Sequence, residues 1–227
     1  MNKQVSAKIR AIITGATGMV GEGVLHECLL HKDVETVLVI GRRSCGVTHP
    51  KLKEIIHGNF HNISSLENEL TGYNACFFCL GVSSVGIKEI EYTHLTYDLT
   101  MHVAETLCRL NNDMTFCYIS GAGTDSTEKG RLMWARVKGK TENDLLRIPF
   151  YQVYHFRPGI IEPTKELNNT LPYYKYVNWL LPVIRRIAPK YISSLKELGL
   201  AMINVVTIGY PKQVLEVKDI VELAGKA

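Results

Sequence analysis

The sequence predicts an α/β fold with a doubly wound parallel sheet, and three observations indicate it. Short apolar runs rich in β-branched residues recur along the chain, and stretches with helical spacing of apolar residues lie between them. A glycine-rich turn follows the first apolar run. The 227 residues, 46% of them apolar, can bury one sizeable core, so we expect a single domain over residues 1–227.

Seven runs have the length and composition of buried parallel strands. In chain order they are IRAIIT (9–14), ETVLVIG (35–41), the weaker KEIIHG (53–58), ACFFCLG (75–81), TFCYIS (115–120), QVYHFRP (152–158) and VLEV (214–217). Between the fourth and fifth runs, apolar side chains recur every three or four residues, which predicts one long helix over 92–110. The tail predicts a helix over 193–206, then a turn, the last strand and a closing helix.

Residues 162–190 are rich in proline and tyrosine, and we expect them to leave the sheet. In an open α/β sheet such late insertions fall beyond the carboxyl ends of the strands, beside the ligand crevice. The segment is therefore our candidate substrate cover. Its most apolar part, residues 174–187, contains Pro182 and ends in Arg185 and Arg186, which favours a surface or dimer-contact helix over a membrane segment.

Composition and charge exclude several classes of function. The formal net charge of +4 is small for this length, and the basic residues are spread along the sequence. We therefore expect no nucleic-acid partner. The first apolar stretch is too short for a signal sequence and no run of about 18 apolar residues follows, so we expect a cytoplasmic protein without membrane contact. A homo-oligomer is a possible assembly, but no residue pattern in the sequence shows which surface would form its interface.

The cysteines and the other potential metal ligands do not point to a metal or redox centre. The only close pair, Cys76 and Cys79, lies in an apolar run, which predicts a buried strand with reduced thiols. No group of histidine, cysteine or carboxylate residues has the spacing of a metal site, so no metal is expected.

A strand, a glycine turn and the start of a helix follow one another in IRAIITGATGMVGEGVLHECL (9–29). Gly15 permits a tight turn, Gly18 lets the backbone approach a pyrophosphate, and Gly21 lets the helix pack close to the strand. The helix N-terminus then faces the phosphates. The expected cofactor contacts here are Gly15, Thr17, Gly18, Met19, Val20 and Gly21. A merely structural glycine turn is the alternative interpretation.

The second predicted strand ends in GRRS, the point at which dinucleotide folds select their cofactor. Arg42 and Arg43 are planar, permanently charged donors suited to a 2′-phosphate, which predicts NADP (NADPH) in preference to NAD. A pair of solvated arginines is the alternative. The other expected cofactor contacts are Leu80, Gly81 and Val82 after the fourth strand and Asn59 and Phe60 after the third, where an adenine would lie.

The ordered set TGATGMVG, GRR, LGVSS, YISGAG and ARVKG resembles the short-chain dehydrogenase/reductase superfamily, whose fold is the Rossmann fold. More narrowly, the chain is similar to an atypical branch related to nucleoside-sugar epimerases and to the Tat-interacting-protein oxidoreductase-like family. The resemblance covers nearly the whole chain, including RPGIIEP after the sixth strand. It implies that Arg157, Pro158 and Gly159 lie near the nicotinamide.

The same resemblance implies catalysis by a serine after the fifth strand and by a YxxxK pair on the next helix. By motif position the serine is Ser120 and the lysine is Lys138, but Trp134 stands at the tyrosine position. An indole N–H is a donor that does not titrate usefully in water, so it cannot deliver a proton to an alkoxide. Losing a general acid typically slows a reaction by about 10² to 10⁴-fold.

Tyr118, Tyr97 and His94 are the residues that could replace the missing tyrosine, although each also fits a structural role. Two hypotheses therefore stay open. The first is an NADP-binding oxidoreductase or epimerase-like enzyme acting on a small carbonyl or hydroxyl compound. The second is a weakly active or inactive NADPH-binding sensor that regulates a partner.

Overall fold

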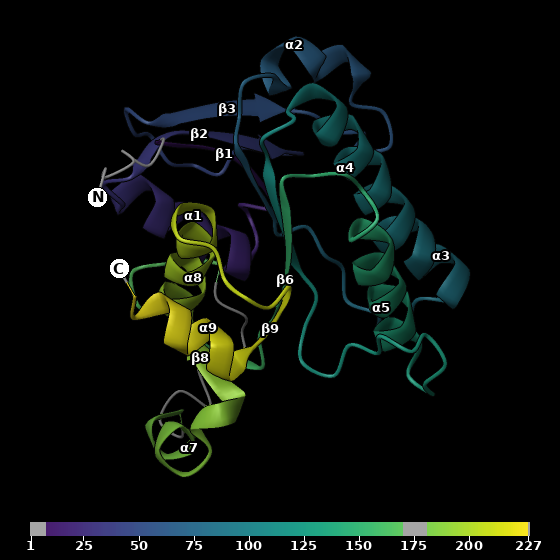
Figure 1. Cartoon of the computed structure of the whole chain (residues 1–227), viewed down its shortest axis with the longest axis vertical. Helices are drawn as coiled ribbons and strands as arrows, with labels where there is room; N and C mark the ends of the chain where they lie inside the picture. The colour runs from purple at the N-terminus through teal and green to yellow at the C-terminus, as the bar shows by residue number, and fades with distance from the viewer. Residues whose placement is uncertain (1–7, 170–180, 227) are drawn as a thin grey trace.

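The computed structural model describes residues 8–169 and 181–226 and has at its centre a seven-stranded parallel sheet of order β3-β2-β1-β4-β5-β6-β9 (Figure 1). The strands are β1 Ile9–Thr14, β2 Val34–Gly41, β3 Leu52–Ile56, β4 Ala75–Phe78, β5 Thr115–Ile119, β6 Gln152–Arg157 and β9 Val214–Glu216. Each of the seven predicted strands is confirmed, with bounds that differ by three residues or fewer. The doubly wound α/β fold is therefore the observed fold.

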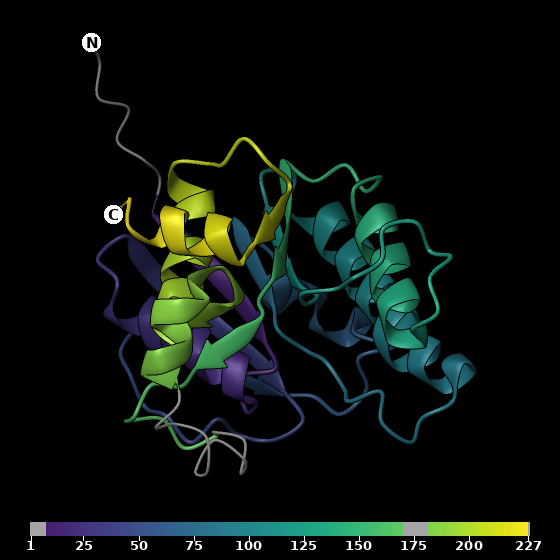
Figure 2. The ribbon, with the colours of Figure 1, turned by 90° about the horizontal axis from the view of Figure 1, so that it is seen from below.

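Helices cover both faces of the sheet (Figure 2). One face carries α1 (Met19–Leu30), α8 (Leu195–Thr207) and α9 (Val217–Ala224), and α8 packs against both of the others. The opposite face carries α4 (Leu99–Leu110) and α5 (Met133–Leu145), with the short α2 (Glu67–Leu70) and α3 (Glu89–Thr93) at its ends. The predicted tail is confirmed as a helix, a turn, a strand and a closing helix.

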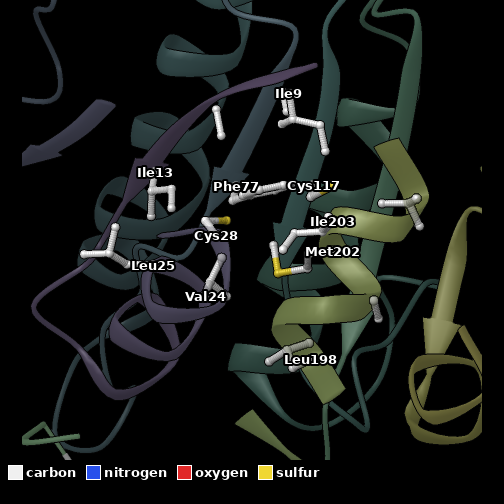
Figure 3. Packing of buried hydrophobic residues seen from close by; sticks show 14 of the residues in the cluster. Ile9, Ile13, Val24, Leu25, Cys28, Phe77, Cys117, Leu198, Met202 and Ile203 are labelled. Carbon is white, nitrogen blue, oxygen red and sulfur yellow. The ribbon is translucent and has the colours of Figure 1, made fainter. Parts of the chain in front are cut away.

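The core consists of two large apolar clusters, one on each face of the sheet. Figure 3 shows Val24 and Cys28 of α1 facing Met202 and Ile203 of α8, with Phe77 of the sheet beside them. All six cysteines are free, and Cys76 is buried on β4 while Cys79 lies just past its end. The expectation that this run is a buried strand is confirmed.

The single long helix predicted over 92–110 is confirmed as a continuous helical segment, and one detail of it was not predicted. A π-helical turn, His94–Asp98, lies between α3 and α4. Tyr92 before it and Val103 after it are both buried, so apolar side chains on both sides of the π turn face the core. Spacing of three or four residues cannot reveal such an insertion, because the periodicity on either side is unchanged.

A second, two-stranded parallel sheet lies outside the main one and was not predicted. It pairs β7 (Ile160–Glu162) with β8 (Ile192–Ser194). Strands of three residues that pair across about thirty residues of chain leave no local alternation pattern to recognise. The pairing closes the excursion that begins near residue 162 and returns it to the body of the protein.

The described parts of the predicted 162–190 cover lie against the start of α1. The Glu22 carboxylate accepts hydrogen bonds from the backbone N–H groups of Asn168 and Asn169, at 3.0 and 2.7 Å. Leu181, at the start of α7 (Leu181–Ile187), joins Met19 of α1 in a small buried cluster. Residues 170–180, which hold part of the predicted cover and of the helix expected over 174–187, lie outside the described residues.

Arg185 of α7 forms ion pairs with Glu162 at 2.8 Å and with Glu197 of α8. The end of the excursion is therefore fastened to both the second sheet and the main body. Over residues 8–169 and 181–226, no helix combines the length and the apolar character needed to cross a membrane.

Candidate cofactor and catalytic site

The glycine turn between β1 and α1 brings three backbone segments into close contact. Gly15 has a φ of 73°, and a Cβ there would lie 2.6 Å from the carbonyl oxygen of Cys79. A Cβ on Gly21 would lie 2.1 Å from the carbonyl oxygen of Gly15. A side chain fits at neither position, since real Cβ atoms do not approach so closely. The turn, the end of β4 and the start of α1 thus form a rigid cradle.

Gly18 plays a different part in this turn. A Cβ there would meet only the Gly15 carbonyl oxygen, at an ordinary contact distance of 3.5 Å. Gly18 is the N-cap residue of the twelve-residue α1, and no side chain caps the helix. The first N–H groups of α1 and the positive end of its dipole are therefore available to an anion. This arrangement fits a dinucleotide pyrophosphate.

A first opening of about 360 Å³ lies at the carboxyl ends of β1 and β2. Its lining residues are Gly15, Ala16, Thr17, Val39, Gly41, Arg42, Arg43 and Leu80. Both arginines are exposed, and neither has a carboxylate partner within the part of the chain that the structure describes. Two unneutralised guanidinium groups beside Thr17 provide the charge that a phosphate requires.

A second opening of about 510 Å³ begins beside the first, and both share Leu80. Its lining includes the predicted residues Gly18, Met19, Val20, Gly21, Leu80, Gly81, Val82, Ser120, Lys138, Pro158 and Gly159. Four others were not predicted: Cys79, Ile119, Gly121 and Ile161. The first three are chain neighbours of predicted residues, and that adjacency was the signal that could have found them. The ends of β4, β5 and β6, the start of α1 and one side chain of α5 therefore converge on one space.

Three predicted cofactor contacts do not line either opening. The Phe60 ring is buried in the apolar core, because it is the residue that packs the chain after β3 onto the sheet. The Asn59 side chain accepts a hydrogen bond from the His61 N–H at 3.1 Å, which shapes its own turn. The buried Phe60 ring is therefore not placed to grip an adenine, whereas the contact of Asn59 with an adenine stays a prediction.

Arg157 is the third residue outside the two linings, and its guanidinium contacts other side chains. It forms a 2.5 Å ion pair with Glu142 of α5 and a 3.2 Å pair with Glu216, and it donates to the Ser126 hydroxyl at 2.6 Å. The Glu142 side chain is only 2% exposed. Arg157 thus fastens β6 to α5 and β9, while its neighbours Pro158 and Gly159 line the second opening.

Ser120 and Lys138 are brought together as the motif implied. The Lys138 ammonium donates to the backbone carbonyl oxygen of Ser120 in a short contact and lies 3.5 Å from that of Ile119. The Ser120 hydroxyl donates to the Phe156 carbonyl oxygen at 3.2 Å. Its lone pairs remain free to accept a hydrogen bond from a ligand.

Two opposing effects act on the Lys138 ammonium. Loss of water around the charged form lowers its pKa to about 8, and the carboxylate of Glu142, one helical turn further along α5, acts against that shift. Glu142 was missed in the sequence, although its i, i+4 spacing from Lys138 placed it on the same helix face.

Trp134 lies one turn before Lys138 on α5, partly buried. Its Cη2 atom lies 3.6 Å from the place that a Cβ on Gly123 would occupy, and Gly123 has a φ of 88°. The ring thus packs over the loop that follows β5. Trp134 is not among the residues that line the second opening.

The residues proposed to replace the tyrosine do not reach this opening. The Tyr118 side chain is 1% exposed in the core, and burial raises its pKa far above the ordinary range. Tyr97 donates to Asp144 at 2.7 Å and faces a separate groove between α4 and α5. His94 stacks on His61 with ring centroids 4.1 Å apart, away from the site. Among the described residues, no group of three histidine, cysteine or carboxylate side chains could hold a metal ion.

Comparison with known proteins agrees with this geometry. The profile of the NAD dependent epimerase/dehydratase family matches residues 11–128. The chain is also similar to the protein fmp52-1, mitochondrial, of Aspergillus oryzae, 28% identical over 68% of this chain and 66% of that protein. A second relative is the FMP52-1 protein of Scheffersomyces stipitis, also named mitochondrial, 25% identical over 71% of this chain and 73% of that protein.

These relatives correct one expectation. Their names place them in mitochondria, so the cytoplasmic location expected from the absence of a signal sequence is wrong. An address that a cellular receptor reads does not have to be a long apolar run, so hydropathy alone cannot detect it.

The fold also resembles solved structures at low identity. One is a UDP-N-acetylglucosamine 4-epimerase from Methanobrevibacter ruminantium, with a TM-score of 0.64 and 14% identity over 95% of this chain and 80% of that one. Another is the Bordetella bronchiseptica enzyme WbmG in complex with NAD, with a TM-score of 0.68 and 12% identity over 98% of this chain and 79% of that one. The Rossmann-type architecture is thus shared with epimerases and dehydrogenases.

Proposed function

The chain belongs to the NAD dependent epimerase/dehydratase family, and from that premise we propose that it is an NADP-dependent oxidoreductase or epimerase-like enzyme for a small carbonyl or hydroxyl compound. The observation that carries the proposal is the shared lining of the second opening. There the glycine cradle of α1, Ser120 after β5 and Lys138 of α5 meet in one space of about 510 Å³.

Preference for NADP is supported by the first opening. Arg42 and Arg43 lie beside Thr17 at the end of β2, with no carboxylate partner among the described residues. The ribose 2′-hydroxyl of NAD needs a hydrogen-bond acceptor at this position, whereas the 2′-phosphate of NADP needs hydrogen-bond donors and positive charge. Titration of the protein with NADPH and with NADH tests the assignment. We expect at least tenfold tighter binding of NADPH, and equal affinities would contradict the proposal.

Different residues of the site are proposed to bind the cofactor, to orient the substrate and to exclude water. The N–H groups at the start of α1 bind the pyrophosphate, and the Lys138 ammonium lines the space that the nicotinamide side would enter. The Ser120 hydroxyl, held by the Phe156 carbonyl oxygen, accepts from a substrate hydroxyl and orients it. A bound nicotinamide supplies or accepts the hydride. Leu80, Val82 and Ile161 exclude water from one side of this space.

We propose the described parts of residues 162–190 as one wall of the substrate space. The contact of Asn168 and Asn169 with Glu22, and of Leu181 with Met19, supports this role, because Met19 also lines the second opening. Glu22→Gln weakens both backbone contacts without changing size. We expect a higher KM for the substrate with little change in NADPH affinity.

Wild-type turnover is the direct test of the enzyme proposal. Oxidation of NADPH is followed with a panel of aldehydes and ketones as substrates. We expect slow but measurable turnover that Lys138→Met abolishes.

One observation favours the second candidate function, an NADPH-binding sensor. Trp134 cannot act as a proton donor, while the cofactor cradle keeps its full geometry. Tight binding of NADPH together with no turnover on any substrate class would favour the sensor over the enzyme.

A further inference from the structure

The position of the Lys138 ammonium in the second opening raises the question of how a proton reaches the substrate. Lys138 and Cys79 are the two titratable side chains among the described residues that line this opening. We propose that the Lys138 ammonium itself gives the proton to the substrate oxygen, replacing the tyrosine that is absent at Trp134. The inference rests on the proposed function and names the general acid of that site.

The hydrogen bonds of Lys138 suit both protonation states of an acid. An ammonium has three N–H donors, and two of them are directed at the carbonyl oxygens of Ser120 and Ile119. The third is left for a ligand in the opening. When the ammonium gives up that proton, the neutral amine keeps two N–H groups for the same two carbonyl oxygens. Its lone pair then faces the opening, where water can restore the proton.

The other groups near the opening are poorer acids. Burial raises the pKa of the Cys79 thiol to about 12, and its side chain packs against the core. The Ser120 hydroxyl donates its hydrogen bond to the Phe156 carbonyl oxygen and so does not direct its proton at a substrate. The Trp134 ring packs toward Gly123 and has no titratable group. Lys138 is the remaining group with a proton to release at neutral pH.

The surroundings of Lys138 make its release of a proton easier. Loss of hydration lowers its pKa to about 8, near the working pH at which a general acid is most effective. Glu142 on the same helix is the charged group that opposes this shift, and its carboxylate is neutralised by Arg157 of β6. From β5 and β6, Tyr118 and His155 contribute no charge, because burial raises the pKa of the first and lowers that of the second to about 4.

The proposed step balances as follows. The substrate carbonyl carbon accepts a hydride, with its electron pair, from a reduced nicotinamide. The π bond of the carbonyl breaks toward oxygen, and an O–H bond forms as the N–H bond of Lys138 breaks. The carbonyl is reduced, the nicotinamide is oxidised, and the neutral lysine takes a proton from water. In the reverse direction the neutral amine accepts the proton of the alcohol.

Lys138→Arg tests the proposal because it keeps the positive charge and the donors but cannot release a proton near neutrality. We expect NADPH affinity within about fivefold of wild type and carbonyl reduction lowered by at least 100-fold. Lys140→Arg is the matched control, since Lys140 lies on the same helix and pairs with Asp144 outside the opening at 2.6 Å. It should change turnover by less than twofold. Retention of more than a tenth of wild-type turnover by Lys138→Arg would overturn the proposal.

A titration that does not depend on activity provides the second readout. In protein labelled with ¹³C-lysine, the Cε signal missing from Lys138→Arg identifies Lys138, and we expect that signal to titrate near pH 8. In wild type the reduction rate should fall above the same pH, since the proton donor is lost there. A Lys138 pKa near the ordinary 10.5, or a pH profile with no such fall, would sink the idea.

The double variant Trp134→Tyr with Lys138→Arg separates loss of the acid from damage to the site. A tyrosine at 134 stands where the resemblance places the donor of this helix, so we expect at least a tenfold rescue over Lys138→Arg alone. No rescue would mean that the arginine harms more than proton transfer, and the proposal would fall. If wild type binds NADPH but never turns over, the proposed function fails. If wild type turns over and Lys138→Arg does too, only the role of Lys138 fails.

Discussion

Two regions of this site differ in how they are held and in what they retain. The cofactor half, from Gly15 to Gly21 with Arg42 and Arg43, is shaped by backbone contacts too close for side chains. The catalytic half, formed by β5, α5 and β6, is held by the buried ion pair of Glu142 and Arg157. The first has the glycine turn and the two arginines that dinucleotide binding would use, and the second carries Trp134 where the resemblance implies a tyrosine. We therefore expect binding of the cofactor and catalysis to be separable properties in this chain.

The largest expected effect comes from breaking the ion pair of the catalytic half. Glu142→Ala leaves the Arg157 guanidinium, 11% exposed, without its main partner. Breaking a buried pair in this way typically costs about 3 to 5 kcal/mol of unfolding free energy. Urea denaturation of the variant and of the wild type measures this loss of unfolding free energy. Arg109→Ala, which removes an exposed ion pair with Glu67, is the control and should leave the midpoint nearly unchanged.

If Glu142→Ala instead unfolds at the wild-type urea concentration, the catalytic half is held by something other than this pair. The contrast between the two halves would then lose its structural basis.

A smaller effect is expected from Gly21→Ala in the cofactor half. The new Cβ meets the Gly15 carbonyl oxygen, so α1 must move, at a cost of about 1 to 3 kcal/mol. Because the helix N-terminus shifts, NADPH binding should be lost as well. Gly18→Ala is the matched control, since its Cβ finds an ordinary contact. Equal stability losses for the two variants in thermal unfolding would disprove the cradle.

A still smaller effect is expected from Arg42→Ala combined with Arg43→Ala. Removing two exposed guanidinium groups should weaken NADPH binding by about tenfold, or about 1.4 kcal/mol, and leave NADH binding unchanged. Isothermal titration with both cofactors measures the difference. An equal loss for NADPH and NADH would mean that the arginines do not recognise a 2′-phosphate.

The cofactor half could be predicted from the sequence because its determinants are local. A strand, a glycine turn and a helix follow one another within residues 9–30, and Gly15 and Gly21 each have a backbone reason to be a glycine. The strands were equally accessible, because a buried parallel strand is a continuous apolar run. Arg42 and Arg43 were found for the same reason, as they directly follow β2.

What could not be predicted depends on contacts between distant segments. Phe60 follows a strand in a favourable position, but its ring turns into the core, and spacing does not tell which way a single aromatic side chain points. Arg157 lay in a motif near the nicotinamide, yet Glu142 holds it, and that pairing exists only once β6 and α5 are packed. The π turn before α4 left the apolar period intact and so gave no signal.

The measurement that tests the separation of binding and catalysis most directly is a paired one on Trp134→Tyr. NADPH affinity and the rate of NADPH oxidation with a carbonyl substrate are measured on the same preparation as wild type. The account predicts an affinity within about twofold of wild type, because the ring lies outside the lining of the cofactor opening. It predicts a rate about 10 to 100-fold higher, because a tyrosine at the position that the resemblance assigns to the donor adds a second proton donor to the Lys138 ammonium. An unchanged rate, or a tenfold change in NADPH affinity, would contradict it.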